Sequence, residues 1–332
     1  MDNLTSNSSN ASDANQILSI SGFITFNVVM LIGFILPAAV LDSCILIALA
    51  VDKVTPIQIR FILANFLLVG LVLLFILTVE HLTALVLATT DYPLPPLEFC
   101  STILWALFGA GALRLTLTAS FSIVVFILIV KGINAINKTA LVISVILLWI
   151  LCFFSLNIPL LALPANNAYV NDVACLPVGN KDGIDVAFAA IYVLVFGVTP
   201  LLVSIVMPIT TSVYMFKHKA TESSNVPFLK AMAKLSALLI LGGLVNFIGQ
   251  VSPAVISLVA FSVLNDSKSG INVYYASLIF LNMSLWPTPI LILVYVKSLH
   301  VNVKKALRYF TRWYRYDAEQ PSGTTVDTVQ ST

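Results

Sequence analysis

Seven long apolar runs, separated by short polar stretches, make up most of this 332-residue chain. A helix needs about 20 mostly apolar residues to cross the roughly 30 Å hydrocarbon core of a bilayer, so each run predicts a transmembrane helix. The strand alternation of a membrane barrel is absent from these runs, which favours helices. We therefore predict an all-α membrane protein, a seven-transmembrane helix bundle with spans at residues 21–51, 60–89, 99–130, 139–163, 186–216, 234–264 and 271–296.

The composition agrees with this prediction and excludes several classes of function. Of all residues, 59% are hydrophobic and 10% are charged, and the mean hydropathy is +1.00, whereas soluble domains carry about 25% charged residues. The net charge of +2 is too small to indicate a nucleic-acid partner. The four cysteines lack metal-ligand spacing, and the sequence contains no glycine-rich phosphate loop or hydrolase motif. We expect no enzyme activity, no metal and no cofactor.

Basic residues are concentrated in the loops on one side of the predicted bundle. That side holds 14 of the 17 Lys and Arg residues; the other side holds only Lys181 and Lys268, and Arg114 lies inside the third run. Basic loops remain in the cytosol during insertion, so the N-terminal segment, which has no Lys or Arg, is predicted to be extracellular. We expect a multi-pass protein of the plasma membrane, surrounded by lipids, with a cytosolic C-terminus.

The same pattern divides the chain into four segments. Asn3, Asn7 and Asn10 each begin a glycosylation sequon in the first segment, and an unmodified polar tail is the alternative for each site. The segments are an extracellular glycosylated tail at 1–20, the transmembrane bundle at 21–297, a basic amphipathic eighth helix at 298–316 and a disordered cytoplasmic tail at 317–332.

Cysteine and proline landmarks relate the chain to a known family. Cys100 lies at the outer end of the third span and Cys175 in the second outer loop, and the later spans contain Trp149, Pro159, Pro200, Pro253 and Pro289. From about residue 23 to 310, this order resembles the rhodopsin-like (class A) family of G-protein-coupled receptors. The resemblance implies a Cys100–Cys175 disulfide, an extracellular ligand, and heterotrimeric G protein and arrestin as cytoplasmic partners. A seven-span transporter or channel is the alternative.

The activation motifs of that family are replaced in this chain. Val124-Val125-Phe126 stands where the family has Asp-Arg-Tyr, Val251 replaces the tryptophan two residues before Pro253, and Thr288-Pro289-Ile290-Leu291-Ile292 replaces Asn-Pro-x-x-Tyr. A receptor-like decoy or scaffold that does not couple to G proteins is therefore an alternative to a signalling receptor.

Four ionisable side chains lie within the spans, namely Asp42, Glu80, His81 and Arg114. Such residues are costly in hydrocarbon unless paired, so each is a candidate functional residue. The resemblance places Asp42 and Arg114 near mid-membrane and puts Gly70 where the family has a sodium-binding aspartate. We infer that Arg114 takes the place of the sodium ion, pairs with Asp42 and uses the space at Gly70, with hydrogen bonds completed by Asn246, Ser284 or Thr288. The pair is either a fixed lock or one that breaks during switching.

The outer third of the bundle is the expected ligand site. Glu80 lies 20 residues beyond Arg60, which is about 30 Å along a helix. The alternative is that Glu80 only snorkels or hydrogen-bonds to a neighbouring helix. Leu107 stands at the position of the amine-binding aspartate and Asn282 at that of the retinal-linking lysine, so the resemblance argues against a conventional amine receptor and a visual pigment. A chemosensory ligand is our hypothesis. The ligand-binding candidates are Glu80, His81, Leu107, Asn157, Gln250 and Asn282.

Overall fold

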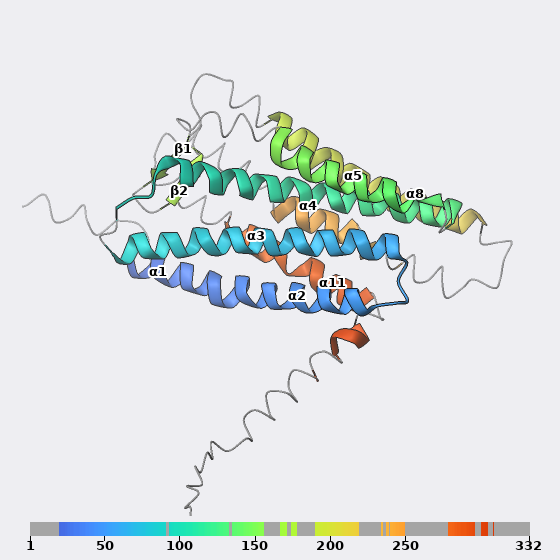
Figure 1. The fold of residues 1–332 in the computed structure, drawn as a ribbon, viewed down its shortest axis with the longest axis horizontal. Helices are drawn as coiled ribbons and strands as arrows, with labels where there is room; N and C mark the ends of the chain where they lie inside the picture. The colour runs from blue at the N-terminus through green and yellow to red at the C-terminus, as the bar shows by residue number, and fades with distance from the viewer. Residues whose placement is uncertain are drawn as a thin grey trace, which may run out of the picture.

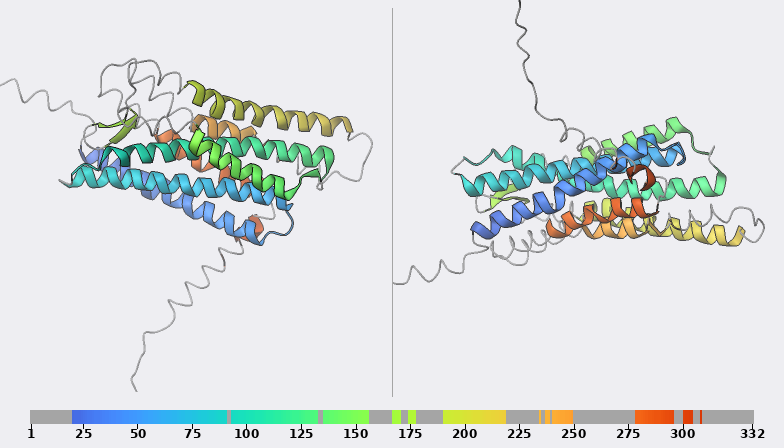
Figure 2. Two further views of the ribbon diagram at one scale, coloured as in Figure 1. Left: turned by 45° about the horizontal axis from the view of Figure 1, so that its top comes forward. Right: turned by 90° about the horizontal axis from the view of Figure 1, so that it is seen from below.

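Long helices lying side by side along one axis dominate the computed structural model (Figure 1). Consecutive long helices run in opposite directions, and the two further views agree (Figure 2). A small hairpin of strands lies at one end, which we call the hairpin end. The described residues are 20–90, 93–132, 135–155, 167–170, 174–177, 190–218, 234, 237–238, 240–249, 278–295, 300–304 and 308.

The first long helix contains a π-helical segment. It consists of α1 (Ile20–Val29), η2 (Met30–Ile35) and α2 (Leu36–Val51). Pro37 lies at the start of α2 and has no N–H to donate to the preceding turn, which accounts for the change of hydrogen-bonding pattern at this point. The same arrangement recurs where η6 (Val193–Val198) leads into α8 (Thr199–His218), with Pro200 at the junction.

Helix α4 (Leu97–Lys131) is the centre of the bundle. It contacts α3 (Ile57–Thr89), α5 (Lys138–Ile150), η4 (Leu151–Ser155), η6 and α8. With 35 and 33 residues, α4 and α3 are each about 50 Å long, which exceeds the hydrocarbon core. Gly132 ends α4 with φ 85°, and its N–H donates to the Leu128 carbonyl at 3.1 Å. Glycine adopts this left-handed backbone without a steric cost.

The hairpin consists of β1 (Asn167–Val170) and β2 (Ala174–Pro177), which pair antiparallel with Asn167 opposite Pro177. Both strands contact α4. The two strands lie between α5 and α8 in the sequence and sit over the start of α4.

Four of the seven predicted spans are confirmed as helices long and apolar enough to cross a membrane, at Gly22–Val51, Ile57–Thr89, Leu97–Lys131 and Ala190–His218. The other three contain shorter apolar helices at Lys138–Phe154, Ile240–Gly249 and Leu278–Val294. The last of these is interrupted by a turn at Trp286, after which α11 (Pro287–Tyr295) begins. The count of seven spans stays a prediction.

Large apolar side chains cover the outside of the long helices. Phe75 on α3 is 69% exposed and Ile32 in η2 is 64% exposed, and a lipid environment would solvate such a surface where water would not. In the predicted eighth helix, residues 300–304 are helical, with Val303 buried and Val301 exposed. This one-sided burial is what an amphipathic helix requires. The rest of that segment lies outside the described residues.

Candidate functional site

A buried carboxylate and a buried guanidinium lie in the middle of the bundle. Asp42 on α2 is 2% exposed, Arg114 on α4 is 1% exposed, and the two charges interact electrostatically. Gly70 lies on α3, and a Cβ placed there would be 2.6 Å from Asp42 Oδ2. The sequence suggested that the space at Gly70 would serve Arg114. Instead, the Asp42 carboxylate packs against this glycine.

Arg114 packs over an aromatic ring. Its Cζ lies 5.0 Å from the centroid of the Phe66 ring on α3, a cation–π geometry that favours a desolvated guanidinium. No described atom bonds to Arg114 Nε and Nη1 or to Asp42 Oδ1. The predicted pair is thus supported by proximity and charge, while a direct hydrogen bond between the two side chains stays a prediction.

The polar residues expected to complete that pair bond elsewhere. Asn246 is fully buried; its Nδ2 donates to Thr118 Oγ1 at 3.3 Å, and its Oδ1 accepts from Thr288 Oγ1 at 3.5 Å. Ser284 donates to the Leu281 carbonyl of its own helix. Asn246 therefore links α4 to α11. The sequence reasoning missed Thr118, although its position one helical turn after Arg114 placed both residues on one face of α4.

Two glycines let the Ile240–Gly249 helix approach its neighbours closely. A Cβ at Gly243 would lie 2.9 Å from Ser204 Cβ on α8, and a Cβ at Gly249 would overlap the Ser284 side chain. Small residues at such contacts are how membrane helices gain packing without a hydrophobic driving force between them. This helix is therefore held on both sides at close range.

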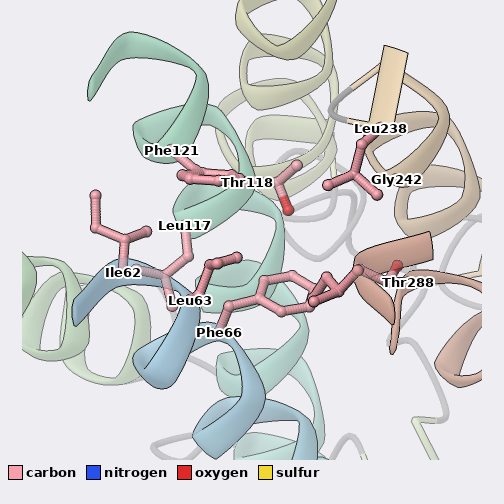
Figure 3. Close-up of a pocket in the computed structure, with 10 residues that line it drawn as sticks. Ile62, Leu63, Phe66, Leu117, Thr118, Phe121, Leu238, Gly242 and Thr288 are labelled. Atoms are coloured by element: carbon pink, nitrogen blue, oxygen red, sulfur yellow. The ribbon is translucent and has the colours of Figure 1, made fainter. Parts of the chain in front are cut away.

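Figure 3 shows a small cavity of about 20 Å³. Its α3 residues, Ile62, Leu63 and Phe66, come from the half of α3 that begins at Ile57, away from the hairpin end. Its walls come from α3, α4, the helix that contains Gly242, and α11. Apolar side chains form most of the lining, and the Thr118 and Thr288 side chains are its polar members.

Near the hairpin end, His81 is bonded within the protein. It is 1% exposed, and its Nδ1 lies 2.7 Å from Asn27 Oδ1 on α1. Asn27 Nδ2 donates to the Phe23 carbonyl at 2.9 Å, so Oδ1 is free to accept and the Nδ1 atom of His81 carries the proton. His81 thus faces α1 in a structural contact, and the sequence reasoning did not identify Asn27.

The remaining ligand candidates are placed only in part. Glu80 is half-buried on α3 and Leu107 is half-buried on α4. Asn282 is buried, and its Nδ2 donates to the Leu278 carbonyl at 2.9 Å. Asn157 and Gln250 lie outside the described residues. Ligand binding by this set stays a prediction.

Indole N–H groups satisfy carbonyls of the π-helical segments. Trp105 Nε1 on α4 donates to the Phe153 carbonyl in η4 at 2.6 Å, and Trp286 Nε1 donates to the Phe34 carbonyl in η2 at 3.1 Å. The ring of Phe153 stacks on that of Trp149, with 5.7 Å between centroids. Because π-helical turns disturb the regular backbone ladder, these bonds tie η4 and η2 to the segments that pack beside them.

The cysteine and motif predictions have mixed outcomes. Cys100 is disulfide-bonded, whereas Cys44 and Cys152 are free thiols. The expected partner, Cys175, belongs to β2, whose backbone contacts α4, and the pairing itself stays a prediction.

At the replaced motif positions, the described side chains are largely packed into the bundle. Val124, Val125, Thr288, Pro289 and Ile292 are buried, and Phe126 is half-buried. Outside the described residues lie Asn3, Asn7, Asn10, Pro159, Val251 and Pro253.

No protein-family model and no curated protein matches the chain.

Proposed function

We propose that the chain is a divergent cell-surface receptor of the rhodopsin-like (class A) G-protein-coupled family. It crosses the plasma membrane seven times, binds an extracellular ligand of a chemosensory class, and signals to a heterotrimeric G protein and arrestin. The observation that carries the proposal is the disulfide-bonded Cys100 in the first turn of α4, beside the hairpin that contains Cys175.

A disulfide at this position has a topological consequence. Such bonds persist in oxidising compartments and are rare in the cytosol, so Cys100 favours an extracellular hairpin end. The other end carries the exposed Lys53, Lys131, Lys138 and Lys217, which agrees with the cytosolic side inferred from the loop charges. Two independent signals therefore support one orientation.

The Asp42 and Arg114 charges support a bundle whose centre is polar but closed. Both charged side chains are almost fully buried, so each depends on the other for charge compensation. This fits a permanent structural lock better than a freely hydrated pore, in which water would solvate the charges. The same site also supports the view that Arg114 stands in for a bound cation.

A second candidate function is a receptor-shaped decoy or scaffold that does not couple. It is favoured by Val124 and Val125, which are 7% and 2% exposed and occupy the positions of the charged family motif. A charged latch to the neighbouring helices cannot form with these side chains. A small-solute transporter or channel is the third possibility.

One cell-based experiment separates the three. The full chain is expressed with a surface tag, and nucleotide exchange on each G-protein class is measured beside membrane current and solute uptake. A lipid-facing variant, Phe75→Ala, serves as the expression-matched control. If nucleotide exchange exceeds that of untransfected cells with both the wild-type chain and Phe75→Ala, the result supports a signalling receptor. Surface expression without exchange supports the decoy, and current or uptake without exchange overturns both.

The orientation has its own test. Asn3→Gln, Asn7→Gln and Asn10→Gln, combined in one variant, should abolish any glycosidase-sensitive mass shift, because only a luminal tail is modified. A wild-type chain at the cell surface that shows no such shift, and whose N-terminal tag is inaccessible to antibody, would contradict an extracellular N-terminus.

A further inference from the structure

The hydroxyl groups at the cavity of Figure 3 belong to a hydrogen-bond chain with a defined direction. Thr288 Oγ1 donates to Asn246 Oδ1 at 3.5 Å, and Asn246 Nδ2 donates to Thr118 Oγ1 at 3.3 Å. Thr118 Oγ1 in turn donates to the Arg114 backbone carbonyl at 2.9 Å. The hydroxyl hydrogens of Thr118 and Thr288 are therefore both engaged in hydrogen bonds.

What remains on the two hydroxyls is acceptor capacity. A hydroxyl has one donor hydrogen and two acceptor lone pairs. Thr118 Oγ1 accepts one bond in this chain, from Asn246, and Thr288 Oγ1 accepts none from a described residue. Both side chains line the cavity. The cavity therefore presents two hydrogen-bond acceptors, the hydroxyl oxygens of Thr118 and Thr288, which suit a ligand with two donor hydrogens.

We infer that this cavity binds one water molecule, which donates to Thr118 and to Thr288. A volume of about 20 Å³ is close to the minimum that holds a single water. A larger donor does not fit. An ion would lose its hydration against a lining that is otherwise apolar, at a cost that two hydroxyls do not offset. Water is the chemical species that meets both the size and the donor count.

This water would form a hydrogen-bonded bridge between helices α4 and α11. The direct Asn246 bonds, at 3.3 and 3.5 Å, are longer than the usual 2.7–3.2 Å range for N–H···O bonds or the 2.5–3.0 Å range for O–H···O bonds. A bridging water is nearly as good enthalpically as a direct bond, so it strengthens the contact of α4 with α11. Because its walls come from four helices, the site exists only while all four keep this packing. The inferred water site does not depend on the proposed signalling activity.

X-ray hydroxyl-radical footprinting of the full chain in detergent tests the inference. Radicals formed from a bound water label adjacent side chains even when bulk solvent cannot reach them. Phe121 lines the cavity and is 5% exposed, while Phe196 is 3% exposed and does not line it. We expect labelling of Phe121 well above that of Phe196. Equal labelling of the two rings would overturn the inference.

Variants make the test specific to the hydroxyls. Thr118→Val with Thr288→Val keeps the shape and removes both acceptors, so labelling of Phe121 should fall to the Phe196 level. Thr116→Val is the matched control, because Thr116 lies on another face of α4, where its hydroxyl donates to the Ala112 carbonyl and accepts from Cys152 Sγ at 3.9 Å. Unchanged labelling of Phe121 in the double variant, or an equal loss in the control, would refute the site.

A cavity-filling variant keeps the test decisive if the double variant misfolds. A Cβ at Gly242 would meet Thr288 Cγ2 and Oγ1 at 4.0 Å, an ordinary contact distance. Gly242→Ala should therefore fold, place a methyl group in the cavity and reduce Phe121 labelling. Undiminished labelling in this variant would place the reactive water somewhere else.

Discussion

Replacing Gly70 with alanine tests the central site most directly. The added Cβ would lie 2.6 Å from Asp42 Oδ2, closer than the 3.4 Å at which ordinary van der Waals contact begins. The carboxylate must then move away from α3, although it is buried and opposite Arg114. We expect Gly70→Ala to destabilise the protein because the pair loses its packing position.

The magnitude follows from two opposing terms. Alanine gains about 1 kcal/mol over glycine in a helix interior, while overpacking a filled core costs about 1 to 3 kcal/mol. Gly33→Ala is the matched control, since Gly33 is an exposed helical glycine whose added Cβ would meet only Val29 Cγ1, at 3.9 Å. Gly33→Ala should therefore stabilise the protein by about 1 kcal/mol, and Gly70→Ala should be about 1 to 3 kcal/mol less stable than this control.

Thermal melting of the purified protein in detergent gives the comparison. A third measurement uses a background in which Asp42→Ala and Arg114→Leu remove both charges. With the carboxylate gone, Gly70→Ala should become stabilising, like the control. If Gly70→Ala raises the melting temperature of the wild-type chain as much as Gly33→Ala does, the packing of Asp42 against α3 is wrong.

Two further predictions concern buried polar contacts. Asp42→Ala should lower the free energy of unfolding by about 3 to 5 kcal/mol, because it leaves the Arg114 charge unpaired. Asp42→Asn combined with Arg114→Ser should recover much of the expression. If the single substitutions are additive within about 0.5 kcal/mol in a double-mutant cycle, the pair is refuted. Trp105→Phe should cost about 1 to 3 kcal/mol in thermal melting because it leaves the Phe153 carbonyl without its donor. Trp149→Phe, whose bond to Asn65 is long at 3.4 Å, should cost less, and the reverse order would show that these indoles act through packing alone.

The long apolar helices were predictable because their signal is local. A run of apolar residues must satisfy its own backbone in lipid, and that requirement does not depend on the neighbouring helices. The predicted span at 60–89 and the observed α3, Ile57–Thr89, differ by three residues at one end. The charges of Asp42 and Arg114 were conspicuous for the same reason, since they interrupt such runs.

The partners of these residues depend on packing and were not predictable. The sequence cannot say that the Asp42 carboxylate takes up the space at Gly70, because that depends on how α2 and α3 pack. Asn246 was expected at the ion pair, yet it bonds two threonines on different helices. His81 was predicted to contact a ligand, and nothing in the sequence indicated that its Nδ1 bonds the Asn27 amide on α1. In each case the deciding contact joins two different helices, so it depends on how the bundle packs.

The π-helical segment η2 changes how the first helix should be probed. A regular helix turns about 100° per residue, but a π-helical turn accommodates extra backbone and rotates everything beyond it relative to everything before. Asn27 and Asp42 lie on opposite sides of this segment, so one helical wheel cannot place both. A cysteine-accessibility scan should show two periodic patterns with a break in phase at residues 30–35. Labels or cross-links designed from a single continuous wheel would be aimed at the wrong neighbour on one side of that break.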